Sequence, residues 1–225
     1  MSTLRGANKF SYQAHSMTHD FQSLDLLACY SSKWAGRIIS YGTASLLAPQ
    51  RLRLGPSHIA IICKHRDVPI WVESTTLCSH SCVILNRPVK GVQAHTPITR
   101  IQDYTQSGGH VDLYRLSRID QLSNEESVLL SRILIRHFIA EQISYDMGGA
   151  LLSGTRLFKR TRLLPKADLN ELFCSELVAA VLMRLGRLNR ANPTRYNPAC
   201  LLRQLVREGT FQFEQEFPAK QSRLA

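Results

Sequence analysis

Two apolar segments, one strand-like and one helix-like, constrain the fold of this chain more than any other feature of its sequence. The apolar run from Ile59 to Cys63 follows Gly55-Pro56-Ser57, so it is predicted to be a buried strand that begins near His58. From Cys174 onward, apolar residues recur at the spacing of one helix face; they are Leu177, Val178, Val181, Leu182 and Leu185. A histidine at the edge of a strand therefore precedes a cysteine at the start of a helix, an order that suggests a cysteine hydrolase.

Cys174 is predicted to point inward from the first turn of its helix. The helix begins either at an early capping pair, Asp168 and Glu171, or at Phe173. In the second case the thiol lies among backbone N–H groups that have no partner inside the helix. A helix N-terminus and a nearby imidazole are the two environments that favour a reactive thiolate.

A second short strand is predicted from Pro69 to Thr75, after the polar turn His65-Arg66-Asp67. The two strands are expected to form a hairpin. Because side chains alternate along a strand, Glu73 is the natural carboxylate to orient the imidazole of His58. The resulting triad is Cys174, His58 and Glu73. We expect Cys174→Ala and His58→Ala to abolish turnover and leave the fold intact, and Glu73→Gln to reduce turnover less.

At this point the chain resembles the circularly permuted NlpC-type papain-like cysteine hydrolases of the YiiX or YebB-like kind. The resemblance spans roughly residues 22 to 210 and rests on ordered segments: Asp25-Leu26-Leu27, a helix-like Trp34 to Leu47, Pro56-Ser57-His58-Ile59-Ala60-Ile61, Val72-Glu73-Ser74, Tyr145-Asp146, Phe173-Cys174-Ser175-Glu176-Leu177-Val178 and Tyr196-Asn197-Pro198. Ordinary NlpC enzymes place the cysteine helix first, whereas the permuted group places the histidine first, as this chain does.

The resemblance implies a fold and a set of roles. It implies an α+β, permuted papain-like fold, with a central antiparallel sheet packed against helices that include the nucleophile helix. By the same resemblance, Cys174 is the nucleophile, His58 the base and Glu73 the orienting residue, while the Tyr145 hydroxyl helps to polarise the attacked carbonyl. The implied substrate is a peptidoglycan stem peptide or another peptide or isopeptide bond, and no cofactor or metal is expected.

Two alternative functions stay open. Lipid acyltransferases related to lecithin:retinol acyltransferase share the permuted fold, but their nucleophile typically sits in an Asn-Cys-Glu-His-Phe-like segment, and this chain has Phe173-Cys174-Ser175-Glu176 instead. For such a lipid acyltransferase or lipase, Ala35 to Leu47 is a candidate interfacial helix, although Trp34, Ile38 and Leu46 fit a core equally well. The other alternative is a non-catalytic binding module with a basic face.

A metal site is a further alternative reading of the cysteines and histidines. Cys63-x-His65 followed by Cys78-x-His80-x-Cys82 would place soft ligands on one side of neighbouring strands. The spacing does not match the usual zinc patterns, and Cys63 continues an apolar strand. The six cysteines have no paired spacing, which favours a reducing interior over a disulfide framework.

Length and local signals predict one α+β domain. With 225 residues, 44% of them hydrophobic, we expect an arm at residues 1–21, a single domain at 22–217 and a tail at 218–225. Further elements are a strand from His110 to Leu116, a helix from the capping box at Ser123 to about Glu141, and a helix that starts at Asn197-Pro198 and ends before Gly209. No apolar run approaches the roughly 18 residues of a membrane span, and no signal peptide is evident, so we expect synthesis in the cytoplasm. If the target is a cell wall, we expect delivery as a phage protein or a secreted effector protein.

The formal net charge of +11 predicts an anionic partner, such as a cell-wall polymer, an anionic lipid surface or a nucleic acid. Specific nucleic-acid recognition finds no support, because no zinc-finger spacing or RNA-binding aromatic motif accompanies the charge. The basic residues concentrate in two groups: Arg156, Lys159, Arg160, Arg162 and Lys166, then Arg184, Arg187, Arg190 and Arg195.

Overall fold

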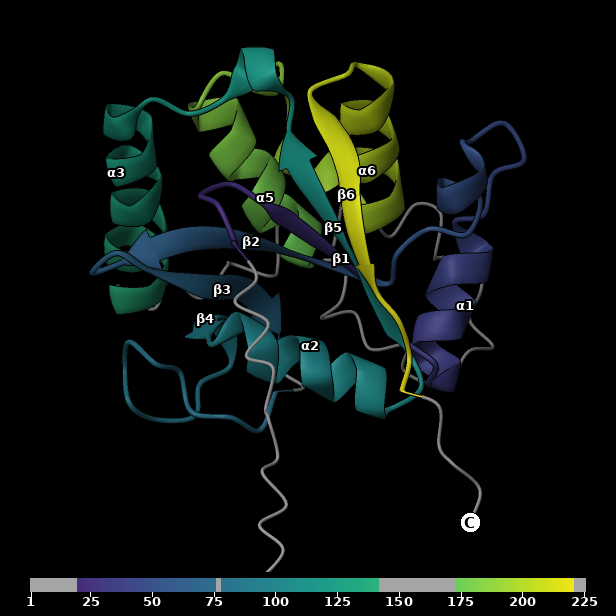
Figure 1. The fold of residues 1–225 in the computed structure, drawn as a ribbon, viewed down its shortest axis with the longest axis horizontal. Coiled ribbons are helices and arrows are strands. Elements are labelled where there is room, and N and C mark those ends of the chain that lie inside the picture. Colours follow the sequence, from purple (N-terminus) through teal and green to yellow (C-terminus); the bar gives the residue numbers. More distant parts are fainter. Residues whose placement is uncertain (1–19, 76–77, 142–172, 221–225) are drawn as a thin grey trace, which may run out of the picture.

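One antiparallel sheet of six strands organises the protein (Figure 1). The computed structural model describes residues 20–75, 78–141 and 173–220. The strands follow the order β4-β3-β2-β1-β5-β6 across the sheet, and each pairs antiparallel with its neighbour. Their bounds are β1 Leu26–Tyr30, β2 His58–His65, β3 Val68–Thr75, β4 Gly91–His95, β5 His110–Leu116 and β6 Phe211–Phe217.

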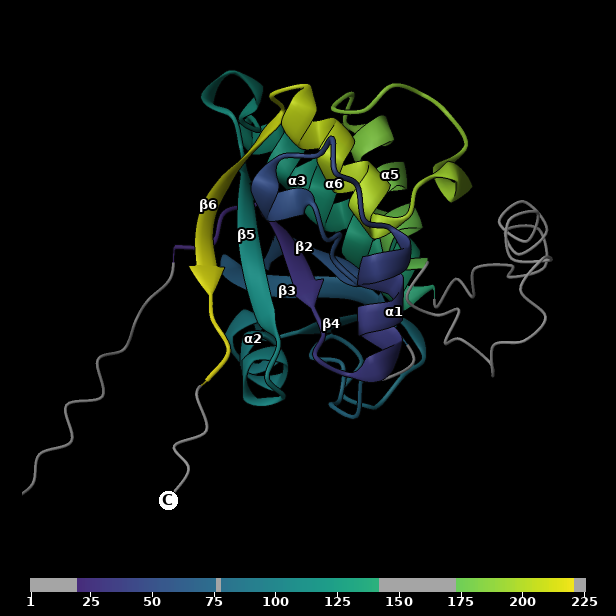
Figure 2. The same ribbon diagram turned by 90° about the vertical axis from the view of Figure 1, so that its right-hand side faces the viewer.

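Helices cover both faces of the sheet, which confirms the α+β class (Figure 2). Apolar residues of α3, α5 and α6 share one core with Ile59 and Ile61 of β2. The opposite face is smaller, and there Ile101 of α2 meets Ile62 and Trp71. The helices are α1 Trp34–Gly42, α2 Pro97–Gln106, α3 Asn124–Arg132 with a π-helical continuation at Ile133–Ala140, α5 Phe173–Arg184 and α6 Pro198–Arg207; short 3-10 turns lie at Gln50–Leu52, Arg118–Asp120 and Pro193–Arg195.

The predicted hairpin of β2 and β3 is confirmed. Ile61 pairs with Val72 and Ile62 with Trp71. Since side chains alternate along both strands, this register puts Glu73 on the same face of the sheet as His58. The strands are joined by the predicted turn, in which Arg66 and Asp67 both adopt positive φ angles of 52° and 64°, as a two-residue hairpin turn requires.

Two predicted helix starts are confirmed by their caps. Ser123 and Glu126 form the reciprocal capping box of α3. The side chain of Asn197 accepts a hydrogen bond from the backbone N–H of Cys200 at the start of α6, where Pro198 is the first helical residue. Both caps supply acceptors for N–H groups that have no partner within the helix.

The helix expected from Trp34 to Leu47 is shorter than predicted, because it ends at Gly42. Glycine weakens the last turn, and the carbonyl of Ile39 accepts hydrogen bonds from both the backbone N–H and the hydroxyl of Thr43, the residue that caps the helix. The inner side of α1 consists of the small residues Gly36 and Ser40, which are its buried positions. Across the described ranges, no helix is long and apolar enough to cross a membrane.

Candidate active site

The structure brings Cys174, His58 and Glu73 together from three different elements. His58 begins β2, Glu73 lies near the end of β3, and Cys174 is the second residue of α5. All three are buried, with 0% of Cys174, 2% of His58 and 0% of Glu73 exposed. The apolar face of α5 fixes this arrangement, since Leu177, Val178 and the later apolar positions are buried as the helical spacing predicted.

The imidazole of His58 lies between the carboxylate and the thiol. Its Nε2 atom is 2.7 Å from Oε2 of Glu73, which leaves Nδ1 as the ring nitrogen for Cys174. The backbone N–H of Ile59 donates to Sγ of Cys174 at 3.4 Å. The sulfur therefore receives a main-chain hydrogen bond from the residue that follows the histidine, and it also lies in the first turn of a helix, where the dipole favours negative charge.

The electrostatics of the site favour an ionised histidine beside an ionised carboxylate. Burial disfavours the charged ring, but the charge and hydrogen bonding of Cys174, together with Glu73, outweigh it and raise the pKa of His58 to about 10. Burial alone would raise the pKa of Glu73 as well. The hydrogen bond from His58 and the charge of Arg100 instead hold the pKa of Glu73 well below its usual range.

Arg100, on α2, is a site residue that the sequence did not reveal. Its Nε donates to Oε1 of Glu73 at 2.6 Å, and NH2 donates to Oε2 at 3.3 Å, so the guanidinium contacts both oxygens of the carboxylate. NH1 donates to Asp103 at 2.5 Å. The Tyr104 ring lies 5.4 Å from the guanidinium carbon and 6.5 Å from the imidazole, measured to the ring centroids. Arg100 is thus anchored by one carboxylate while it holds another.

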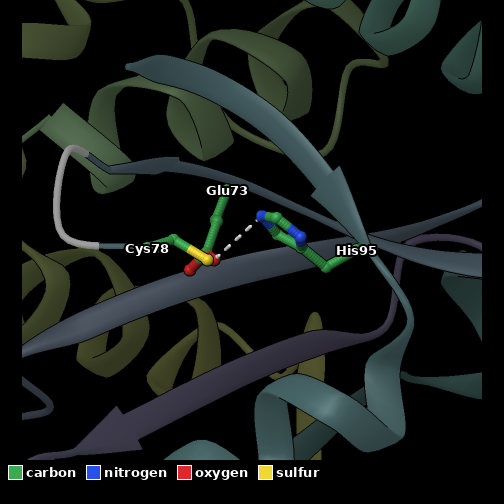
Figure 3. A group of neighbouring side chains, drawn as sticks. All are labelled: Glu73, Cys78 and His95. Carbon is green, nitrogen blue, oxygen red and sulfur yellow. Dashed lines mark ion pairs between the residues drawn. The ribbon is translucent and has the colours of Figure 1, made fainter. Parts of the chain in front are cut away.

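Glu73 also belongs to a group of side chains with metal-ligating atoms (Figure 3). Ligand atoms of Glu73, Cys78 and His95 all lie within 4.8 Å of one another. Both oxygens of Glu73, however, already accept hydrogen bonds from Arg100 or His58. A cation at this place would meet the guanidinium charge, so the arrangement fits a carboxylate that orients a histidine better than one that binds a metal.

The metal cluster considered from the sequence is not assembled. Among the described residues, the group around Glu73 is the one set of three or more side chains placed for metal binding, and of the predicted ligands it contains Cys78 alone. Cys63 and Cys82 are both fully buried in the larger core, and Sγ of Cys82 accepts a hydrogen bond from the N–H of Ala94. All six cysteines are within the described residues, and none forms a disulfide.

Several predicted functional residues are not described. Tyr145, the capping pair Asp168 and Glu171, and the first basic group from Arg156 to Lys166 all lie outside the described residues. Of the second basic group, Arg187 has a structural role: it donates to the carbonyl of Asp120 and forms an ion pair with Glu126 at 3.0 Å.

Compared with known protein families and with curated protein sequences, the chain matches no family model and no curated protein.

Proposed function

We propose that this protein is a cysteine hydrolase of amide bonds, built on a permuted NlpC-type papain-like fold. The observation that carries the proposal is the buried line from Glu73 through His58 to Cys174, with 2.7 Å between Oε2 and Nε2 and a main-chain N–H on the sulfur. A buried ion pair of this kind costs desolvation energy, and it is found where a charged nucleophile and its proton donor are needed.

The proposed reaction has two stages. Sγ of Cys174 attacks the carbonyl carbon, His58 gives its proton to the departing nitrogen, and an acyl-thioester forms as the amine leaves. His58 then takes a proton from water, whose oxygen attacks the thioester and releases the carboxylic acid. Glu73 keeps the ring oriented throughout, and we expect the backbone N–H of Cys174, with the Tyr145 hydroxyl, to stabilise the oxyanion. The substrate class we propose is a peptidoglycan stem peptide or another peptide or isopeptide.

The first test is the alkylation rate of Cys174 against pH, followed at the peptide level by mass spectrometry. Peptide-level detection separates Cys174 from Cys200, which is exposed, and from Cys78. We expect fast alkylation well below about pH 8.5, where an ordinary thiol ionises, and loss of that reactivity in His58→Ala. His137→Ala is the matched control, because His137 pairs with Glu141 rather than with the triad or with the Asp103 carboxylate that anchors Arg100.

An ordinary thiol titration in both the wild type and His58→Ala would reject the hydrolase and favour the binding module with a basic face.

A second candidate is a lipid acyltransferase or lipase that uses the same three residues. The observation in its favour is that Trp34, Ile38 and Leu46 are exposed rather than part of the core. Products distinguish the two: hydrolysis of peptides or isopeptides supports the first proposal, whereas release or transfer of a fatty acyl chain from a lipid supports the second.

A further inference from the structure

The segment from α1 to the start of β2 presents a cluster of large apolar side chains to solvent, which we call the α1 surface. Leu47 is 99% exposed, Leu46 is 88% exposed and Trp34 is 61% exposed. Single exposed apolar residues are ordinary, but several within one short segment of the chain favour an interaction site. The α1 surface comprises Trp34, Ile38, Tyr41, Leu46, Leu47 and Leu54.

The orientation of α1 makes this exposure a property of the fold. Its buried positions are Gly36 and Ser40, and a Cβ atom on Gly36 would lie 2.5 Å from Cβ of Ser31. Only a glycine fits that approach, so α1 cannot rotate to bury larger side chains there. Trp34, Ile38 and Tyr41, spaced four and then three residues apart, therefore stay on the outer side.

Within the chain segment that forms the α1 surface the charged side chains have a single sign, although one of them, Arg51, pairs with Glu216 of β6 at 2.8 Å. From Leu26 to Arg66 the sequence contains no aspartate or glutamate, while Lys33, Arg37 and Arg53 are exposed within this stretch. The guanidinium carbon of Arg37 lies 6.0 Å from the centroid of the Tyr41 ring, so a cation and an aromatic side chain meet at the outer side of the helix.

We propose that the α1 surface docks on an anionic phospholipid membrane. A protein that lies on such a membrane combines three features. Aromatic residues lie at the level of the headgroups, exposed leucines enter the acyl region, and lysine and arginine residues flank them. The inference does not depend on the catalytic proposal, because it concerns binding alone.

Docking at this surface also sets the orientation of the active site. The buried side of α1 lies close to Ser57, because a Cβ atom on Gly36 would be 3.2 Å from Oγ of Ser57. Ser57 directly precedes His58, so this side of α1 is next to the start of the active-site strand. In the ribbon, α1 lies at the opposite side of the molecule from α3 (Figure 1). A protein docked through α1 therefore holds the beginning of β2 close to the lipid and α3 away from it.

The test is sedimentation of the full chain with vesicles of phosphatidylcholine alone or with added phosphatidylserine. We expect binding to the anionic vesicles, weaker at about 0.5 M than at about 0.1 M salt, and little binding to phosphatidylcholine alone. Fluorescence gives a local readout, since the chain has two tryptophans, and Trp71 is fully buried whereas Trp34 is exposed. Contact with the membrane should shift the emission of Trp34 to shorter wavelength.

The variant Leu46→Ser with Leu47→Ser should lower the partition coefficient at least about tenfold. Ile119→Ser is the matched control, because Ile119 is 97% exposed but lies in the 3-10 turn after β5. Replacing Lys33 and Arg37 by glutamine should weaken binding to the anionic vesicles as well.

Three results would overturn the proposal. Equal binding to neutral and anionic vesicles would show that the basic side chains do not contribute to binding. Unchanged binding of the double leucine variant would show that the apolar side chains do not contribute. A wild-type dimer that becomes monomeric in the leucine variant, without any vesicle binding, would instead identify a second copy of the chain as the occupant of the α1 surface.

Discussion

Glu73 is held from two sides, by the imidazole of His58 and by the guanidinium of Arg100. Sequence reasoning found His58, Glu73 and Cys174, because a strand edge, a hairpin face and a helix start are local patterns that place a side chain. It missed Arg100, since nothing in the sequence around α2 shows that this helix lies under β3. Arg100 and Glu73 are 27 residues apart in the sequence, and they meet only because α2 packs against β3 in the folded protein.

This double contact leads to a stability prediction. Glu73→Gln removes the negative charge but leaves Arg100 buried, so the free energy of unfolding should fall by about 3–5 kcal/mol. Adding Arg100→Met removes a buried charge that is left with Asp103 as its one carboxylate partner, and it should recover most of that loss while turnover stays low, because the imidazolium has lost its partner. Urea denaturation measures the stability of the single and double variants, and a double variant no more stable than Glu73→Gln would contradict the ion-pair account.

Asp112 provides a prediction about pH. It is 1% exposed, and neither of its oxygens has a hydrogen-bond partner among the described residues. Burial raises its pKa to about 6 from the ordinary value of 3.8, although Arg51 lies 3.8 Å away. Since the folded state holds this proton more tightly than the unfolded state, the contribution of Asp112 to stability is most favourable below about pH 4 and declines as the pH rises to about 6.

The change should amount to about 3 kcal/mol. We therefore expect the stability difference between Asp112→Asn and the wild type to shift in favour of the variant between pH 4 and pH 7, as measured by denaturation at each pH. A difference that is constant over this range would show that folding does not raise the pKa of Asp112.

At the scale of elements, the sequence was most informative where a local signal marks an end. The β2–β3 hairpin, the capping box of α3 and the Asn197 cap of α6 were all predicted. The end of α1 was wrong because apolar residues continue past Gly42 into a loop. Strand β6 was not predicted, since between its buried ends, Phe211 and Phe217, the residues are largely exposed and the alternation is weak.

The hairpin turn carries a prediction of its own. Arg66 and Asp67 both occupy the left-handed region, which costs energy for a residue with a side chain. Replacing them by Asn and Gly, which suit this turn, should raise the free energy of unfolding by about 1 kcal/mol. Thermal unfolding would measure the gain, with Arg66→Lys as a control that retains the strain; an equal effect of both variants would exclude backbone strain as the cause.

At the scale of the whole molecule, the order of the strands is what sequence patterns could not supply. The pairing of β1 with β5 joins strands separated by most of the first half of the chain, and β6 returns from the C-terminal part to complete the sheet. Such pairings follow from how the helices cover the two faces, and no residue near a strand encodes its distant neighbour. The permuted papain-like arrangement therefore stays a proposal.

Strand β6 leads to a prediction about truncation. A chain that ends at Thr210 loses Phe211, which is 1% exposed, and leaves β5 as an open sheet edge. We expect it to aggregate, whereas a chain that ends at Lys220 should stay monodisperse. Size-exclusion chromatography compares the two, and Phe211→Ala should cost about 3–5 kcal/mol in the full chain. A folded, soluble 1–210 chain would show that β6 is dispensable.

The distance along the chain between base and nucleophile has a consequence for synthesis. Cys174 comes 115 residues after Ile59, the residue whose backbone N–H donates to the sulfur of Cys174. The hairpin with His58 and Glu73, and then α2 with Arg100, leave the ribosome well before the thiol does. A nascent chain therefore contains the proposed base and its carboxylate partner before it contains the proposed nucleophile. Reactivity arises only after α5 has been translated and packs against β2.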